Sequence, residues 1–278
     1  MRRLIPLLAA GALLALAPAA HAAVETATFG AVTAKFSYTK KSELQYTNLH
    51  LNITRAGVQL FDGPTPPACS NPNCGFWPGG LGTTPSVRVL DLDGDGEPEV
   101  VVQVYSGGAH CCTFAEIYSY SAAMGTYVNF EQEFGSGAYK LVDLNGDRLP
   151  EFKSVDPRFD EAFTAHAAST EPIQIWDFRG GKLVDVTRSY RSLIRKDAAY
   201  QLKLYKKYRA KRDFDIRGFL ASWVADEYLL GHTRTAQRVL NAALRRGELS
   251  KPRGTGFSSG RKYVQRLTKL LKQYGYAT

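Results

Sequence analysis

The pattern of apolar residues divides the chain into two halves. In the first half, short segments rich in β-branched and aromatic residues alternate with Gly, Pro, Asn and Asp, which is typical of strands separated by turns. The segments that fit this pattern best are Thr28–Tyr38, Leu49–Leu60, Val100–Tyr105, Ala115–Tyr120 and Ile173–Phe178. Gly, Pro, Asn, Ser and Thr dominate the sequence from Asp62 to Pro85, and we expect a long surface loop there.

In the second half, apolar residues recur at helical spacing, and no proline occurs between Pro172 and Pro252. Such stripes are typical of the buried faces of amphipathic helices. They comprise Ile194, Ala198, Leu202 and Tyr205; Leu220, Trp223, Val224 and Tyr228; Ala236, Val239, Leu240, Ala243 and Leu244; and Tyr263, Val264, Leu267, Leu270, Leu271 and Tyr274. The sequence therefore predicts an α+β protein, with a β-rich domain over residues 23–186 and a helical domain over residues 187–278.

Residues 1–22 have the layout of a cleavable export signal. Arg2 and Arg3 precede an apolar run over residues 4–18, and the small residues Ala20 and Ala22 favour cleavage after Ala22. The run is short for a membrane span, and no later segment reaches the roughly 18 apolar residues that a span needs. We therefore expect a secreted, extracellular or cell-envelope protein with no integral membrane span.

Charge is distributed unevenly between the two predicted domains. Residues 23–185 contain 11 Lys and Arg against 20 Asp and Glu, whereas residues 186–278 contain 22 against 6. The helical domain includes a basic run made of Lys203, Lys206, Lys207, Arg209, Lys211 and Arg212. Such a run is usually a solvated face, but it can also bind a polyanion. An acidic cell-surface polymer or another extracellular protein is therefore a candidate partner, and nucleic acid is not expected.

The chain has four cysteines, Cys69, Cys74, Cys111 and Cys112. An even number in an exported protein predicts disulfides. Two bridges from the Cys69–Cys74 loop to the adjacent pair are favoured, since a bridge between neighbouring residues strains the peptide that joins them. The alternative is a Cys69–Cys74 bridge with a vicinal one. His110 beside the pair is compatible with a metal or redox centre, but the pair lacks the usual two-residue spacer, which favours a structural staple.

Two aspartate-rich segments repeat at an offset of 52 residues. VLDLDGDGEPEVV begins at Val89, and LVDLNGDRLPEFK begins at Leu141. Side-chain oxygens at positions 1, 3, 5 and 9 of a tight loop, with the backbone carbonyl of position 7, can converge on one hard cation, and calcium suits such a loop better than magnesium. The predicted ligands are Asp91, Asp93, Asp95, Glu97 and Glu99 in the first loop, and Asp143, Asn145, Asp147, Leu149 and Glu151 in the second.

These loops differ from an EF-hand, which requires a bidentate carboxylate at position 12 and flanking helices. Position 12 is Val102 in the first loop and Ser154 in the second. Position 6 is Gly96 in the first loop but Arg148 in the second. A positive φ at that position disfavours a residue with a side chain, so we expect the second loop to be strained.

The motifs D-x-D-G-D-G-x-x-E and D-x-N-G-D-x-x-x-E resemble the calcium loops of FG-GAP/VCBS repeats, the blades of integrin-α-like propellers. The resemblance covers about Ser86 to Asp156. It implies that the β-rich domain carries two propeller-blade-like loops that bind Ca²⁺. A full propeller has 4–8 blades, so the resemblance implies a truncated or rearranged form, or one that closes by association.

The sequence contains no G-x-S-x-G, H-E-x-x-H or phosphate-binding glycine loop. Carboxylate pairs such as Glu131/Glu133 and Asp160/Glu161 are more typical of a solvated face than of a glycosidase. The leading hypothesis is a secreted calcium-binding protein with a binding, adhesion or structural role, more plausibly not an enzyme. The alternatives are an extracellular hydrolase with unrecognised catalytic residues and a polyanion-binding protein that uses the helical domain.

Overall fold

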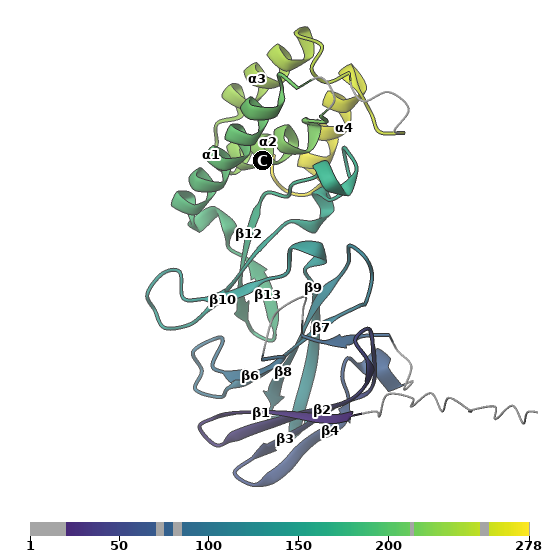
Figure 1. Ribbon diagram of the computed structural model, residues 1–278. Coiled ribbons are helices and arrows are strands. Elements are labelled where there is room, and N and C mark those ends of the chain that lie inside the picture. The colour runs from purple at the N-terminus through teal and green to yellow at the C-terminus, as the bar shows by residue number, and fades with distance from the viewer. Residues whose placement is uncertain (1–20, 71–74, 80–84, 212–213, 251–255, 278) are drawn as a thin grey trace, which may run out of the picture.

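The computed structural model describes residues 21–70, 75–79, 85–211, 214–250 and 256–277, without the side chains of residues 69 and 70. Three antiparallel sheets come first along the chain and a layer of helices follows (Figure 1). The predicted α+β class, with the strands N-terminal and the helices C-terminal, is confirmed. The predicted export signal lies outside the described residues except for its last two, His21 and Ala22, which begin the first strand.

The first sheet is a four-stranded antiparallel meander. Its strands are β1 (His21–Phe29), β2 (Val32–Ser42), β3 (Gln45–Arg55) and β4 (Val58–Pro64). The predicted single strands Thr28–Tyr38 and Leu49–Leu60 were wrong in extent, because each contains a hairpin turn. Gly30 (φ 56°), Ala56 (φ 48°) and Gly57 (φ 81°) take the positive φ angles that tight hairpin turns require.

The second and third sheets share one plan. The second contains β5 (Trp77–Pro78), β6 (Val87–Leu90), β7 (Glu99–Tyr105), β8 (Thr113–Ser121) and β9 (Thr126–Glu133). The third contains β10 (Lys140–Val142), β11 (Glu151–Val155), β12 (Ile173–Arg179) and β13 (Lys182–Asp185). Strands β6 to β9 and β10 to β13 each form an antiparallel meander, and an aspartate-rich loop joins the first strand to the second in both. The strands predicted within β7, β8 and β12 are confirmed.

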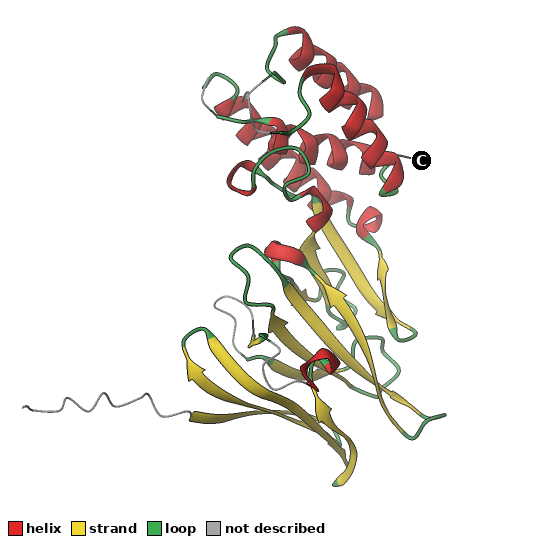
Figure 2. Ribbon diagram, turned by 90° about the vertical axis from the view of Figure 1, so that its right-hand side faces the viewer, coloured by secondary structure: helices red, strands yellow, loops and turns green. Residues whose placement is uncertain are grey.

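The sheets are stacked in layers (Figure 2). Val100, Val102 and Val104 of β7 pack with the first sheet, whereas Val101 packs toward the third. Every residue of β7 is buried, because this sheet is covered on both faces. In the part of the chain that the structure describes, the three sheets remain separate layers and do not close into a propeller ring.

The helical layer contains α1 (Arg191–Tyr208), α2 (Arg217–Leu229), α3 (Thr233–Arg245) and α4 (Gly260–Gln273). Each helix carries one of the four predicted stripes. In α2 every residue except Glu227 is buried, because the other helices and the 3-10 turns surround it. Short 3-10 helices connect the described elements: η1 (Pro67–Ser70), η2 (Gly135–Gly137), η3 (Pro157–Phe159), η4 (His166–Ala168) and η5 (Thr187–Ser189).

The core of the helical layer extends beyond the predicted domain boundary. Phe159, Phe163, Ile173 and Ile175 precede residue 186, yet they pack in one cluster with the helices. The helices therefore pack on the third sheet through a shared apolar core. The division of the chain into two separable domains at residue 186 stays a prediction. None of the described helices has both the length and the apolar character needed to cross a membrane.

Candidate metal centre

The first aspartate-rich loop is closed by hydrogen bonds to its own carboxylates. Asp91 accepts from the backbone N–H of Gly94 (2.7 Å) and of Gly96 (3.1 Å). Glu99, the first residue of β7, accepts from the N–H of Leu92 (2.9 Å) and is buried. The carboxylates at positions 1 and 9 therefore hold the loop in a tight turn from both ends.

The second loop repeats these bonds at the equivalent positions. Asp143 accepts from the N–H of Gly146 (2.6 Å) and of Arg148 (3.0 Å). Glu151 accepts from the N–H of Leu144 (2.7 Å). Each glutamate is also paired across its hairpin with the strand residue just before the loop, which gives the two loops the same register. The sequence repeat therefore encodes a repeated structure.

Positions 3 and 5 also agree between the loops. Each side-chain oxygen at these positions accepts from the backbone N–H two residues later, as in an Asx turn. The pairs are Asp93 with Asp95 N–H (3.3 Å), Asp95 with Glu97 N–H (2.7 Å), Asn145 with Asp147 N–H (2.8 Å) and Asp147 with Leu149 N–H (2.8 Å). Both loops therefore contain the same two Asx turns.

Three carboxylates converge in the first loop. Oxygens of Asp91, Asp93 and Glu99 all lie within 4.8 Å of one another. Burial, together with the neighbouring aspartates, raises the pKa of Glu99 to about 8. A cation placed among these oxygens would compensate the buried negative charge.

The other predicted ligands of the first loop lie outside this group. Asp95 accepts from the N–H of Glu97 rather than joining the three carboxylates. The Glu97 side chain forms an ion pair with Arg55 and accepts from the hydroxyl of Tyr127 (3.4 Å). Coordination by Asp95 and by the Glu97 carbonyl stays a prediction.

The second loop is less compact around its carboxylates. Within the described ranges, it does not bring three of them as close together as the first loop does. Glu151 accepts a hydrogen bond from the Tyr190 hydroxyl, and the Asn145 amide donates to Asp147 (2.8 Å). Hydrogen-bond donors of the protein therefore already occupy some of the carboxylate oxygens of this loop. Coordination through the Leu149 carbonyl stays a prediction.

The two loops meet in space. A Cβ built on Gly94 would lie 3.0 Å from a methyl carbon of Leu149. Between the loops is a small cavity of about 60 Å³, whose lining includes Asp93, Asp147 and Asp177. Asp177 belongs to β12 and carries no local sequence signal, because only the pairing of the third sheet brings it to the loops.

Arg148 takes a positive φ of 75°, close to the 84° of Gly96 at the same position. The expected strain in the second loop is therefore present. We expect Arg148→Gly to raise the free energy of unfolding by about 1 kcal/mol, because glycine adopts this conformation without the clash of a Cβ. Gly96→Ala should lower it by about 1 kcal/mol, since a Cβ there meets no atom within 4 Å and only the backbone is strained. Urea unfolding of both variants checks this, and shifts of the same sign contradict it.

The favoured connectivity, with two bridges from the Cys69–Cys74 loop to the adjacent pair, is wrong. Cys111 and Cys112 form a vicinal disulfide. Cys74 and the side chain of Cys69 lie outside the described residues, so a bridge between them stays a prediction. The predicted long loop from Asp62 to Pro85 contains the end of β4, η1 and β5 in its described part.

A groove lies between the third sheet and the C-terminal segment. Two adjoining cavities of about 370 and 480 Å³ share Gln174, Asp185 and Tyr274 as lining residues. Arg158 forms a bidentate pair with the buried Asp156 (2.7 and 2.6 Å) and lies over the Tyr274 ring, 4.2 Å from its centroid. The side chain of Arg158 therefore contacts those of both Asp156 and Tyr274.

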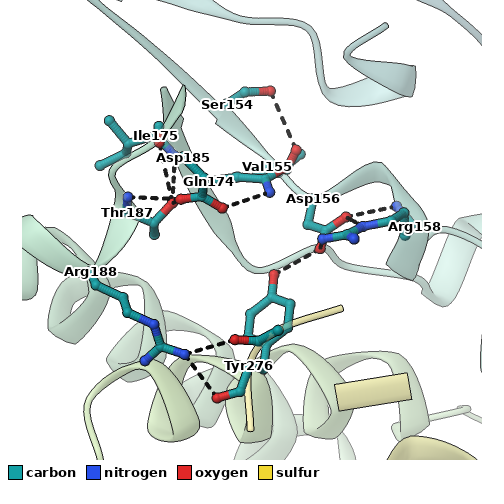
Figure 3. Close-up of polar contacts among 11 residues, drawn as sticks. Ser154, Val155, Asp156, Arg158, Gln174, Ile175, Asp185, Thr187, Arg188 and Tyr276 are labelled. Carbon is teal, nitrogen blue, oxygen red and sulfur yellow. Dashed lines mark hydrogen bonds and ion pairs between the residues drawn. The ribbon is translucent and has the colours of Figure 1, made fainter. Parts of the chain in front are cut away.

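The same hydrogen-bond network anchors the C-terminal segment. The hydroxyl of Tyr276 donates to Asp156 (2.9 Å), and Arg188 donates to the backbone carbonyls of Gly275 (2.9 Å) and Tyr276 (3.0 Å) (Figure 3). Tyr276 itself is buried. The groove is therefore best explained as the seam where the C-terminal segment docks on the sheet.

The basic run lies at the end of α1 and just beyond it. Its described members Lys203, Lys206, Lys207, Arg209 and Lys211 are all exposed, and Arg212 lies outside the described residues. The ammonium groups of Lys207 and Lys211 lie over the Tyr208 ring, at 5.0 and 5.2 Å from its centroid. Polyanion binding by this run stays a hypothesis.

The chain is similar to two other proteins over part of its length. A probable thylakoid lumen protein of Synechocystis sp. is 33% identical over 149 residues, which cover 52% of this chain and 44% of the relative. An uncharacterized protein of Sinorhizobium fredii is 32% identical over 159 residues, which cover 55% of this chain and 24% of the relative. Each similarity therefore spans less than half of the relative. No protein-family model and no solved structure matches the chain.

Proposed function

We propose that this protein is an exported calcium-binding protein in which Ca²⁺ rigidifies two equivalent hairpin loops of a β scaffold that serves a binding, adhesion or structural role. The observation that carries the proposal is the duplication itself. Two four-stranded meanders each place the same loop between their first and second strands, with the same carboxylates at positions 1 and 9. A repeated set of oxygen ligands on a repeated scaffold supports two cation sites of one kind.

Calcium fits the donor set. All side-chain donors at the predicted positions are carboxylate or amide oxygens, which hard cations prefer, and a loop that supplies several of them suits the larger and less strictly octahedral ion. Asp91, Asp93 and Glu99 already lie close together in the first loop. Binding therefore requires only small movements there.

The likeness to FG-GAP/VCBS repeats belongs to this proposal. It is supported by the meanders β6 to β9 and β10 to β13, each built as one blade would be, with the loop in the equivalent hairpin. The sheets are stacked rather than arranged in a ring, so the likeness extends to single blades. Export is supported by the N-terminal signal pattern and by the name of the Synechocystis relative, which refers to the thylakoid lumen.

Calcium should stabilise the protein, and the first loop should bind it more tightly. The first loop presents four carboxylates, whereas the second presents three because Asn145 is neutral, and the guanidinium of Arg148 repels the ion. Extracellular modules commonly have Kd values of about 10⁻⁴–10⁻³ M, so calcium at ten times Kd should add about 1.4 kcal/mol per site. Chelation should then lower the Tm by several degrees.

Calorimetric titration and thermal melting with calcium or chelator test this for wild type, Asp93→Ala and Asp147→Ala. Glu43→Gln, at an exposed turn of the first sheet, serves as the matched control and should retain both the affinity and the calcium-dependent gain. An unchanged melt in chelator contradicts the proposal. A larger loss of affinity in Asp147→Ala than in Asp93→Ala reverses only the ranking of the sites.

A further inference from the structure

The vicinal cysteines face a carboxylate from the neighbouring strand. Cys112 Sγ lies 3.0 Å and Cys111 Sγ lies 3.9 Å from Glu133 Oε1. One ligand atom from each of the three side chains falls within 4.8 Å of the other two. The pairing of Phe114 with Glu133, and the hydrogen bond from Phe134 N–H to the Thr113 carbonyl (2.8 Å), fix this juxtaposition through the backbone.

A carboxylate is an unexpected neighbour for a disulfide. The sulfurs of a disulfide carry no proton, and a carboxylate oxygen is an acceptor only, so the two groups offer each other lone pairs alone. The approach becomes favourable when a thiol donates to the carboxylate, or when a cation lies between sulfur and oxygen. The surroundings of the pair are thus better suited to its reduced form than to the disulfide.

The site is accessible, and a histidine precedes it in the chain. Cys111 is exposed, whereas Cys112 is buried. His110 stacks against His166 with ring centroids 4.2 Å apart. His166 Nδ1 is bonded to Asp160 (2.9 Å), and metal-binding histidines commonly hold the second ring nitrogen in this way.

We propose that Cys111, Cys112 and Glu133 form a binding site for a thiophilic divalent cation of the Zn²⁺ type, and that reduction of the vicinal pair opens it. A dithiol reductant gives two electrons and two protons to the disulfide and becomes a disulfide itself, which leaves Cys111 and Cys112 as thiols. The cation then replaces both thiol protons and binds two thiolates and the Glu133 carboxylate. Two thiolates and one carboxylate leave one position of a tetrahedral ion for water or an imidazole.

This site differs in chemistry from the aspartate-rich loops. Thiolates select soft and borderline cations, whereas the loops offer oxygen alone. The two proposals rest on different residues, and either can fail without the other.

Titration with Cd²⁺ tests the site, because cadmium thiolates absorb in the ultraviolet through charge transfer. Wild type should give this absorption, with one additional Cd²⁺ bound per chain, after reduction and not in the disulfide form. The double variant Cys111→Ser/Cys112→Ser, which keeps Cys69 and Cys74, should lose it. Glu133→Gln should keep the absorption but bind Cd²⁺ at least about tenfold more weakly, since loss of even an outer partner costs that much.

Glu43→Gln is the matched control, because it neutralises an exposed carboxylate at a turn of the first sheet and should leave the cadmium absorption and the affinity unchanged. A reduced double variant that binds like wild type, a disulfide form that binds equally well, or an unchanged affinity in Glu133→Gln each overturns the proposal. The Glu133→Gln result stands without removal of either cysteine, so the test does not depend on folding of the double variant.

Discussion

Arg217→Met is expected to lower the free energy of unfolding by about 3–5 kcal/mol, the usual cost of breaking a buried ion pair from one side. Arg217 is fully buried at the start of α2, and its guanidinium forms a bidentate pair with Asp215 (2.8 and 2.5 Å). It also donates to the Ser258 carbonyl (2.7 Å), just before α4. Methionine fills a similar volume but leaves the Asp215 charge and this carbonyl unpaired.

Urea unfolding of three variants separates the charge effect from packing. The double variant Asp215→Asn/Arg217→Met removes both charges and should recover part of the loss. Lys40→Met breaks the exposed pair with Glu43 and should cost far less, because solvent screens that pair. A loss in Arg217→Met no larger than the loss in Lys40→Met would show that the buried pair is not essential to the helical layer.

Asp226→Asn is expected to raise the free energy of unfolding at neutral pH by about 1–3 kcal/mol, the range for an unsatisfied buried polar group. Asp226 is fully buried in α2, and neither oxygen has a hydrogen-bond donor among the described residues. Burial first, and then the neighbouring Asp197 and Glu227, raises its pKa well above 3.8. A proton on Asp226 lets it donate to the neighbouring Asp197, which also accepts from the N–H of Ile173 (3.2 Å), and an asparagine amide can donate in the same way at any pH.

The direction of the pH dependence of stability follows from proton binding. Above about pH 3.8 the unfolded chain loses the Asp226 proton while the folded protein keeps it, so wild-type stability falls as pH rises toward the raised pKa. The advantage of Asp226→Asn should therefore be small below pH 3.8 and grow as the pH is raised. Unfolding free energies measured across this range check it, with Glu43→Gln as a matched surface carboxylate. A variant that is equally or less stable than wild type at neutral pH would rule out the shared proton.

The local patterns in the sequence predicted much of the fold. All four helical stripes lie on helices, because spacing along one helix depends only on nearby residues. The two predicted strands that proved to be hairpins were wrong because the β-branched pattern continues on both sides of a short turn. The burial of α2 on nearly all sides and the double coverage of β7 depend on which layers pack against them, and neither can be predicted from the period of one segment.

For the candidate sites, too, the sequence predicted the local groupings of residues and not the long-range ones. The two aspartate-rich loops were found from sequence because all their predicted ligands lie within nine residues of one another, and the hydrogen bonds of both loops match. Glu133 is 21 residues from Cys112, and only the register between β8 and β9 brings them together. The same is true of Asp197 and Asp226, which meet because α1 packs against α2. Long-range pairs of this kind require the tertiary structure.

Because the sheets are stacked one on another, the first sheet protects the second from self-association. The second sheet has no free apolar face only because the first sheet covers Val100, Val102 and Val104. If β1 to β4 detach, the freshly exposed surface is a flat, valine-rich β face, which favours self-association and aggregation. The N-terminal sheet thus shields the strands that carry the first aspartate-rich loop, and we expect changes that loosen its docking to promote aggregation under stress.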